Sequence, residues 1–243
     1  MKITLHKKIA AYFGYKFTRI NENINQNQNL QTIELIKQHK IDLILDVGAN
    51  FGQFGTDMRN AGYLGQIISF EPVNKCYQRL SSIADDKWQI ENFALGDKNS
   101  KEEINISNMT VYSSILNVNE IGKSNFSNSI KVVGKQNILV KKLDDIINGL
   151  VNNLNKRRVF LKLDTQGYDN RVIRGSLQTL EHVHVLQTEI SCKGIYMDTP
   201  SVPQRLEELL NLGFSITGIF PISRDKNTME ILEFDCLLIR TNK

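Results

Sequence analysis

The sequence predicts an α/β fold in which helices cover both faces of a mostly parallel, seven-stranded sheet. Three observations lead to this prediction. Short apolar runs of strand length alternate with amphipathic segments of helix length along most of the chain. A glycine-rich turn follows the first apolar run, and two strand-like runs lie close together near the end of the chain. Alternating strands and helices indicate βαβ units, whose right-handed crossovers place helices on both faces of a parallel sheet.

The predicted elements fall into two halves. In the first half we expect a helix at residues 30–40, a buried strand at 42–47, a helix at 53–62, a strand at 65–72, a helix at 73–84 and a strand at 88–95. In the second half we expect a strand at 159–164, a helix at 168–180, a strand at 183–190, a helix at 202–213 and strands at 214–220 and 234–241. The last two strands are close enough in sequence to form an antiparallel hairpin.

Residues 97–142 form an insertion between the two halves. The segments 102–107 and 136–143 have strand patterns, but the stretch between them is rich in Ser and Asn and has no helical period. An irregular insertion of this length inside a compact domain is usually either functional or disordered. The insertion is therefore a candidate for contacts with a substrate.

The chain of 243 residues divides into a basic N-terminal arm with a polar linker, residues 1–29, and one domain, residues 30–243. Residues 5–20 have the apolar spacing of a basic amphipathic helix. We expect this helix to pack on its own domain or on a second subunit of a homodimer. Weak contact with an anionic membrane surface is the alternative interpretation.

The positive charge of the chain is concentrated in this arm. Residues 1–20 hold five of the 30 Lys and Arg residues and no acid, which leaves 25 basic against 26 acidic residues elsewhere. A nucleic-acid enzyme usually carries a basic face on its main domain, so we expect no nucleic-acid partner. No apolar run approaches the ~18 residues of a membrane span, and no secretory signal is recognisable. These features predict a cytoplasmic protein.

The sequence offers no pattern of metal ligands. The three cysteines are widely spaced and include no C-x-x-C pair, which argues against a disulfide framework and against a thiolate zinc site. Asp144 and Asp145 are adjacent acids, but they begin a predicted helix, where acids suit the helix dipole. We therefore expect no bound metal ion.

The turn after the first strand, in "LILDVGANFGQFG" (43–55), resembles a nucleotide-binding loop but has neither the dinucleotide nor the P-loop pattern. Asp46, just before the turn, would repel a pyrophosphate and attract an ammonium group. Glu71 lies 23 positions beyond Gly48, at the end of the next strand, where a carboxylate can accept hydrogen bonds from both ribose hydroxyls. A ligand with an amino acid at one end and a ribose in the middle suits both acids, and S-adenosyl-L-methionine is such a ligand.

The residues that we expect to bind this cofactor lie at the carboxyl ends of the first three strands. They are Asp46, Gly48, Asn50, Phe51, Gly52, Glu71, Pro72, Asn92 and Ala94.

Four motifs, "DVGANFGQFG", "SFEP", "NFALGD" and "FLKLDTQGYDNRVIRGS", resemble those of the FkbM-type methyltransferases over roughly residues 41–240. The resemblance implies a Rossmann-like class I methyltransferase fold and O-methylation, commonly of a sugar hydroxyl in a glycan or a glycosylated natural product. The fourth motif is the most specific and also departs most from the family. Gln166 and Asp169 stand where glutamates are more common, and Arg174-Gly175 keeps only the glycine of the family's Leu-Lys-Gly.

Methylation of a sugar hydroxyl needs a general base. Asp164, at the tip of the fourth strand, is the first candidate, and Lys162 on the same side of that strand would orient it or pair with it. Glu189, at the end of the fifth strand, is the second candidate. Alternatively, both acids are structural carboxylates that cap the next helix or loop. The expected substrate contacts are a stacking ring, hydroxyl groups and an amide, from Tyr112, Ser113, Ser114 and Gln166.

Two other functions fit the predicted fold. One is methylation of a nucleic acid or a protein. However, amino-methylating DNA enzymes of this fold carry an Asn/Asp-Pro-Pro-aromatic loop after strand four, where this chain has "LDTQGY", and no cysteine here follows a proline. The other is a partner subunit that has lost turnover, which the intact cofactor acids Asp46 and Glu71 argue against.

Overall fold

The structure is a computed structural model, and it describes residues 27–241. The amphipathic helix predicted for residues 5–20 lies outside the described residues. The first described helix is α2 (Gln28–Gln38), and the side chain of Asn27 caps it by accepting a hydrogen bond from the backbone N–H of Leu30 at 3.1 Å. None of the helices in the described part of the chain is long and apolar enough to cross a membrane.

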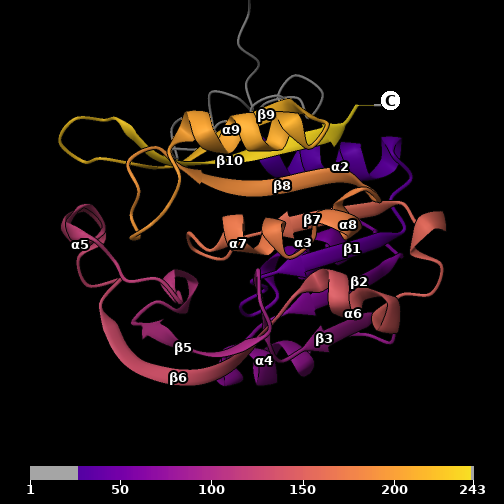
Figure 1. The fold of residues 1–243 in the computed structure, drawn as a ribbon, viewed down its shortest axis with the longest axis horizontal. Coiled ribbons are helices and arrows are strands. Elements are labelled where there is room, and N and C mark those ends of the chain that lie inside the picture. Colours follow the sequence, from indigo (N-terminus) through magenta and orange to yellow (C-terminus); the bar gives the residue numbers. More distant parts are fainter. Residues whose placement is uncertain (1–26, 242–243) are drawn as a thin grey trace, which may run out of the picture.

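The main sheet has seven strands, as predicted (Figure 1). They are β1 (Leu43–Val47), β2 (Gln66–Phe70), β3 (Trp88–Glu91), β7 (Val159–Leu163), β8 (Val183–Ser191), β9 (Phe214–Arg224) and β10 (Ile231–Arg240). Their order is β3-β2-β1-β7-β8-β10-β9, and only β10 runs in the direction opposite to that of the other six strands. The strand order therefore reverses between β1 and β7, and open α/β sheets bind ligands at such a switch point.

Helices pack on both faces of this sheet, which confirms the predicted fold class. These helices are α3 (Gln53–Asn60), α4 (Asn74–Ser81), α6 (Leu143–Leu150), α7 (Asp169–Arg174), α8 (Leu177–Leu180) and α9 (Val202–Asn211). Alternate residues of β1 enter two different cores: Ile44 packs with α2 and α3, whereas Leu43 and Leu45 pack with α6, α7 and α9. Each fully buried aliphatic side chain contributes about 1.5–3 kcal/mol to folding, so the two cores fix the positions of the strand ends.

The prediction of one strand at residues 88–95 is wrong in detail. β3 ends at Glu91, and β4 (Ala94–Leu95) joins a second sheet with β5 (Ser100–Ser107) and β6 (Val132–Lys141), in the order β4-β6-β5. The break lies at Asn92, whose side chain donates to the carbonyl oxygens of Glu71 and Pro72 at 2.9 and 3.3 Å. Phe93, just after the break, is buried in the core beside β2.

The insertion is consequently more regular than its composition indicates. The two predicted strands correspond to β5 and β6, and the stretch between them contains a short 3-10 helix, η3 (Thr110–Tyr112), and α5 (Glu120–Phe126). α5 has only seven residues, too few for a recognisable apolar period. It is held by a small cluster in which Phe126 packs against the buried residues Ile130, Ile195 and Tyr196.

The helix predicted at residues 168–180 is divided into α7 and α8. A Cβ atom on Gly175 would lie 1.8 Å from the carbonyl oxygen of Gly96, so the glycine allows two backbones to touch at the break. The carboxylate of Asp144 accepts hydrogen bonds from the backbone N–H groups of Gln178 and Thr179 at 3.0 and 2.8 Å. Asp144 therefore caps the start of α8, which is a structural role.

Candidate active site

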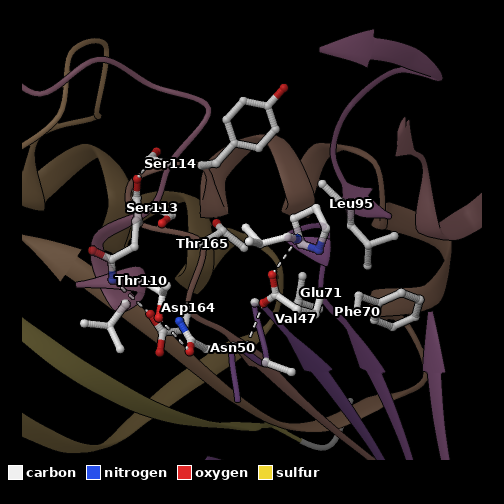
Figure 2. Close-up of a pocket in the computed structure, with 18 of the residues that line it drawn as sticks. Val47, Asn50, Phe70, Glu71, Leu95, Thr110, Ser113, Ser114, Asp164 and Thr165 are labelled. Atoms are coloured by element: carbon white, nitrogen blue, oxygen red, sulfur yellow. Dashed lines mark hydrogen bonds between the residues drawn. The ribbon is translucent and has the colours of Figure 1, made fainter. Parts of the chain in front are cut away.

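A cavity opens at the carboxyl ends of β1, β2 and β7 (Figure 2). Its walls come from the turn after β1, the start of α3, the end of β2, strand β4, the segment around η3 and the loop after β7. The predicted site residues that line it are Gly48, Asn50, Glu71, Pro72, Ala94, Ser113, Ser114, Lys162, Asp164 and Gln166. The predicted site residues that do not line it are Asp46, Phe51, Gly52, Asn92, Tyr112 and Glu189.

The glycine turn after β1 is shaped by contacts inside the protein. Gly48 has φ +77°, and a Cβ atom there would lie 2.0 Å from the carbonyl oxygen of Asp164. Gly52 has φ +85°, and a Cβ atom there would meet the side chain of Leu80 at 2.4 Å. These two glycines therefore let the loop after β7 and helix α4 approach the backbone of the turn closely.

Glu71 connects this turn to the end of β2. It is 4% exposed, and its two carboxylate oxygens accept hydrogen bonds from the backbone N–H groups of Asn50 and Val73, each at 2.7 Å. Burial raises the pKa of Glu71 to about 7, although both backbone donors act in the opposite direction. Each carboxylate oxygen keeps a further lone pair, so Glu71 can still accept hydrogen bonds from a ligand in the cavity.

Asp46 lies beneath the cavity and forms an ion pair with Lys162. It is 0% exposed, and the Nζ atom of Lys162 lies 3.3 Å from its Oδ1 atom. Ser69 donates a hydrogen bond to the other oxygen at 3.3 Å. We predicted that Asp46 would face the ammonium group of the cofactor. In the structure Asp46 faces the ammonium group of Lys162, because the pairing of β1 with β7 places Asp46 and Lys162 side by side.

Lys162 also contacts Asp164, and its Nζ atom lies 3.3 Å from the Oδ2 atom. Burial lowers the pKa of Lys162, but Asp164 and Asp46 outweigh this effect, so the pKa is raised and the lysine stays charged. Burial raises the pKa of Asp46, and Lys162 opposes that shift. Phe54 covers the lysine from α3, with Nζ 5.5 Å from the ring centre.

Asp164 lies in the cavity with 42% of its side chain exposed. Its Oδ1 atom accepts a hydrogen bond from the side-chain amide of Gln166 at 3.0 Å. Lys162 and Gln166 therefore hold the two carboxylate oxygens from different sides. The predicted pairing of Lys162 with Asp164 is present in the structure.

Glu189 lies away from the cavity because β8 continues past it to Ser191 and pairs with β10, where Asp235 is its partner. Burial raises the pKa of Glu189 well above its usual value, and the neighbouring carboxyl group of Glu233 adds to the shift. Tyr112 packs on Phe126 with ring centres 5.3 Å apart. Phe51 packs in the cluster below β4, and Asn92 is exposed.

The sequence did not identify several residues that line the cavity. Thr110, in η3, donates a hydrogen bond to the side chain of Asn50 at 3.2 Å, and this contact joins the insertion to the turn after β1. No local pattern marks Thr110, because its position depends on the fold of the whole insertion. Thr165 also lines the cavity, and Asp169 holds it by accepting from its backbone N–H at 2.9 Å. Asp169, which belongs to the fourth motif, therefore supports the loop after β7.

The two ends of the cavity differ in character (Figure 2). Thr110, Ser113 and Asp164 lie on one side, Phe70 and Leu95 on the other, and Glu71 lies between them. S-adenosylmethionine has the matching arrangement, since its ring system, ribose and charged amino acid follow one another. Within residues 27–241, no group of three or more His, Cys, Asp or Glu residues is arranged to hold a metal ion.

Several solved methyltransferase structures are similar to this chain. Magnesium protoporphyrin IX methyltransferase from Synechocystis, solved with bound S-adenosylmethionine, has 10% identity and a TM-score of 0.47, with 99% of each chain covered. An S-adenosylmethionine-dependent methyltransferase from Mesorhizobium loti has 9% identity and a TM-score of 0.46, with 87% of this chain and 97% of that chain covered. An rRNA methylase from Streptococcus thermophilus has 8% identity and a TM-score of 0.46, with 89% and 98% covered.

No curated protein sequence matches this chain significantly. The sequence profile of the methyltransferase FkbM domain matches residues 46–216. This match begins at the end of β1, covers every segment that lines the cavity and ends in β9. The chain therefore belongs to the FkbM methyltransferase family and is an S-adenosylmethionine-dependent methyltransferase.

Proposed function

We propose that this protein transfers a methyl group to a hydroxyl group of a saccharide, with Asp164 accepting the hydroxyl proton. The observation that carries the proposal is the position of Asp164. It is a half-exposed carboxylate in the cavity, held by two donors and beside the turn after β1. The resemblance of the motifs to FkbM-type methyltransferases supports the choice of a saccharide.

The cofactor's orientation follows from the two ends of the cavity. We infer that the adenine lies between the apolar residues near Phe70 and Leu95, and that Glu71 accepts hydrogen bonds from the ribose hydroxyls. The methionine end then lies over the turn at Gly48 and Asn50. Bound in this way, S-adenosylmethionine supplies a methyl group on a sulfonium, which is an activated leaving group. The protein mainly aligns the acceptor and excludes water.

Asp164 would act directly on the acceptor. The Asp164 carboxylate would accept the proton of the acceptor hydroxyl as its oxygen takes up the methyl group, which the cofactor would supply in leaving as S-adenosylhomocysteine. The ammonium group of Lys162 lies between the carboxylates of Asp164 and Asp46, 3.3 Å from an oxygen of each, and holds Asp164 in place. Ser113 and Ser114 line the same side of the cavity, and their segment would contact further hydroxyls of the sugar.

The charges around the cavity favour a neutral acceptor. Its charged lining residues are three acids, Asp57, Glu71 and Asp164, and one lysine, Lys162, which already contacts two carboxylates. A phosphate backbone would approach this surface against like charge. A neutral saccharide would meet no such repulsion, which supports the saccharide over a nucleic acid.

The acceptor can be tested with S-adenosylmethionine carrying a labelled methyl group. The protein is incubated with neutral saccharides, with RNA, with DNA and with protein from a cell extract. The proposal predicts label in an O-methyl sugar, identified by mass spectrometry after hydrolysis, with Asp164→Asn as the inactive control. Transfer of label to RNA, DNA or protein instead of the saccharides would contradict it.

We place this reaction in the cytoplasm. Cys76, Cys192 and Cys236 are free thiols, and Cys192 is exposed. Free thiols are typical of a reducing compartment. Cell fractionation followed by immunodetection tests this location.

A further inference from the structure

A buried tyrosine far along the chain is connected to Asp164 by hydrogen bonds. Tyr196 lies in the loop between β8 and α9 and is 2% exposed. Its hydroxyl donates to the Oε1 atom of Gln166 at 2.9 Å. The Nε2 atom of the same amide donates to the Oδ1 atom of Asp164 at 3.0 Å. Two successive hydrogen bonds therefore connect Tyr196 to the carboxylate in the cavity.

Gln166 is held firmly between these two partners. Its backbone has φ +53°, and its carbonyl oxygen accepts a hydrogen bond from the hydroxyl of Ser114 at 2.8 Å. The side chain is buried, with the residue 8% exposed, so its amide needs a partner on each side. Because Tyr196 donates to the amide oxygen, the amide nitrogen faces Asp164. Without that donor, the oxygen would be left unsatisfied, and the amide would gain by rotating away.

We propose that Tyr196 is a positioning residue for methyl transfer, which acts through Gln166 to fix the orientation of the Asp164 carboxylate. This inference rests on the proposed role of Asp164 as the proton acceptor. Tyr196 itself does not line the cavity. Its contribution is the hydroxyl group, since a phenylalanine would fill the same space without donating a hydrogen bond.

The surroundings of Tyr196 suit this role. Burial raises the pKa of Tyr196, and the nearby carboxyl group of Glu189 adds to the shift, so the hydroxyl remains a donor at any physiological pH. The carbonyl oxygen of Tyr112, at 3.1 Å, is a second and more distant acceptor for the one proton of this hydroxyl, and the backbone of Tyr196 forms a bridge with Val118. Tyr112 and Val118 belong to the insertion. The insertion is thereby coupled to the position of the base.

The test compares Tyr196→Phe with Tyr63→Phe. Tyr63 is a matched control because it is also buried, and its hydroxyl donates to a backbone carbonyl, that of Gln66 at 3.2 Å, away from the cavity. We expect Tyr196→Phe to lower kcat about tenfold, as the loss of one hydrogen bond in the transition state predicts. The affinity for S-adenosylhomocysteine should stay unchanged, and Tyr63→Phe should keep normal kcat.

A double-mutant cycle separates positioning from general weakening of the structure. Gln166→Ala should lower kcat at least as much as Tyr196→Phe, and adding Tyr196→Phe to it should cause no further loss. Additive losses, or a normal kcat in Tyr196→Phe, would overturn the inference. The variant Asp164→Asn tests the role of Asp164 separately from the role of Tyr196. Near-normal turnover in Asp164→Asn would show that Asp164 is not the proton acceptor. Low turnover in Asp164→Asn, combined with a normal kcat in Tyr196→Phe, would contradict only the role of Tyr196.

Discussion

The backbones of Gly48 and Asp164 touch across the floor of the cavity. A Cβ atom on residue 48 would lie 2.0 Å from the carbonyl oxygen of Asp164. This contact sets the distance between the turn that follows β1 and the loop that carries the proposed base. The glycine is therefore required by the packing of two protein segments, in addition to any contact with a ligand.

Replacing Gly48 should destabilise the fold for two reasons, its positive φ angle and the steric clash of a new Cβ atom with Asp164. Gly62 is the matched control, because its φ of +88° is similar but a Cβ atom there meets nothing within 4 Å. We expect Gly48→Ala to lower the free energy of unfolding by about 2 kcal/mol more than Gly62→Ala, since only the first substitution adds overpacking. Urea denaturation measures both values, and equal losses would contradict the contact.

The ion pair of Lys162 and Asp46 predicts strong coupling between the two residues. Lys162→Met leaves the fully buried Asp46 without a cation and should lower the free energy of unfolding by about 3 kcal/mol. The double variant Lys162→Met/Asp46→Asn should recover most of this loss, because no buried charge remains. Lys135→Met serves as the control, since its pair with Glu103 is exposed and its loss should change little. Additive losses in the double variant would argue against the coupling.

Glu71 should contribute directly to cofactor affinity. We expect Glu71→Ala to weaken binding of S-adenosylhomocysteine by about 1.5–3 kcal/mol, the loss typical of hydrogen bonds to a charged group. Isothermal titration calorimetry measures the change, with the exposed Glu207→Ala on α9 as the control. An unchanged affinity in Glu71→Ala would mean that another group binds the ribose.

The pH dependence of binding offers a separate test of Glu71. Burial raises the pKa of this carboxyl to about 7, so much of it is protonated below that pH, whereas ribose hydroxyls donate to the ionised form. Affinity for S-adenosylhomocysteine should thus be highest above pH 7 and fall by up to about tenfold per unit as pH is lowered towards 6. In Glu71→Gln the profile should be flat, and a flat profile in the unmodified protein would refute the assignment.

The parts of the fold that follow from local patterns could be predicted from the sequence. The apolar runs at β1, β2 and β7 mark the strands, and parallel pairing brings their carboxyl ends to one edge. That reasoning alone brings Glu71 and Asp164 to the same cavity. It also indicates that Lys162 and Asp164 share one side of β7, which the ion pair confirms.

The rest depends on contacts between distant segments. The sequence pattern of residues 88–95 does not show that the side chain of Asn92 forms a hydrogen bond with the backbone at the end of β2, or that β3 ends just before Asn92. Glu189 was expected at a strand end like Asp164, but β8 continues past it to Ser191 and pairs with β10, and Glu189 does not line the cavity. Thr110 lines the cavity only because of the way the insertion folds. Tyr196 comes from the loop after β8, and a small core that it shares with residues of the insertion holds it near Gln166.

The substitution Asp164→Asn tests the central claim most directly, because it keeps the shape of the side chain and removes the base. With a methylated saccharide as the measured product, turnover should fall by roughly 10²–10⁴-fold, while the affinity for S-adenosylhomocysteine stays within about twofold of the unmodified protein. That result would support Asp164 as the proton acceptor. Near-normal turnover, or loss of cofactor binding, would contradict it.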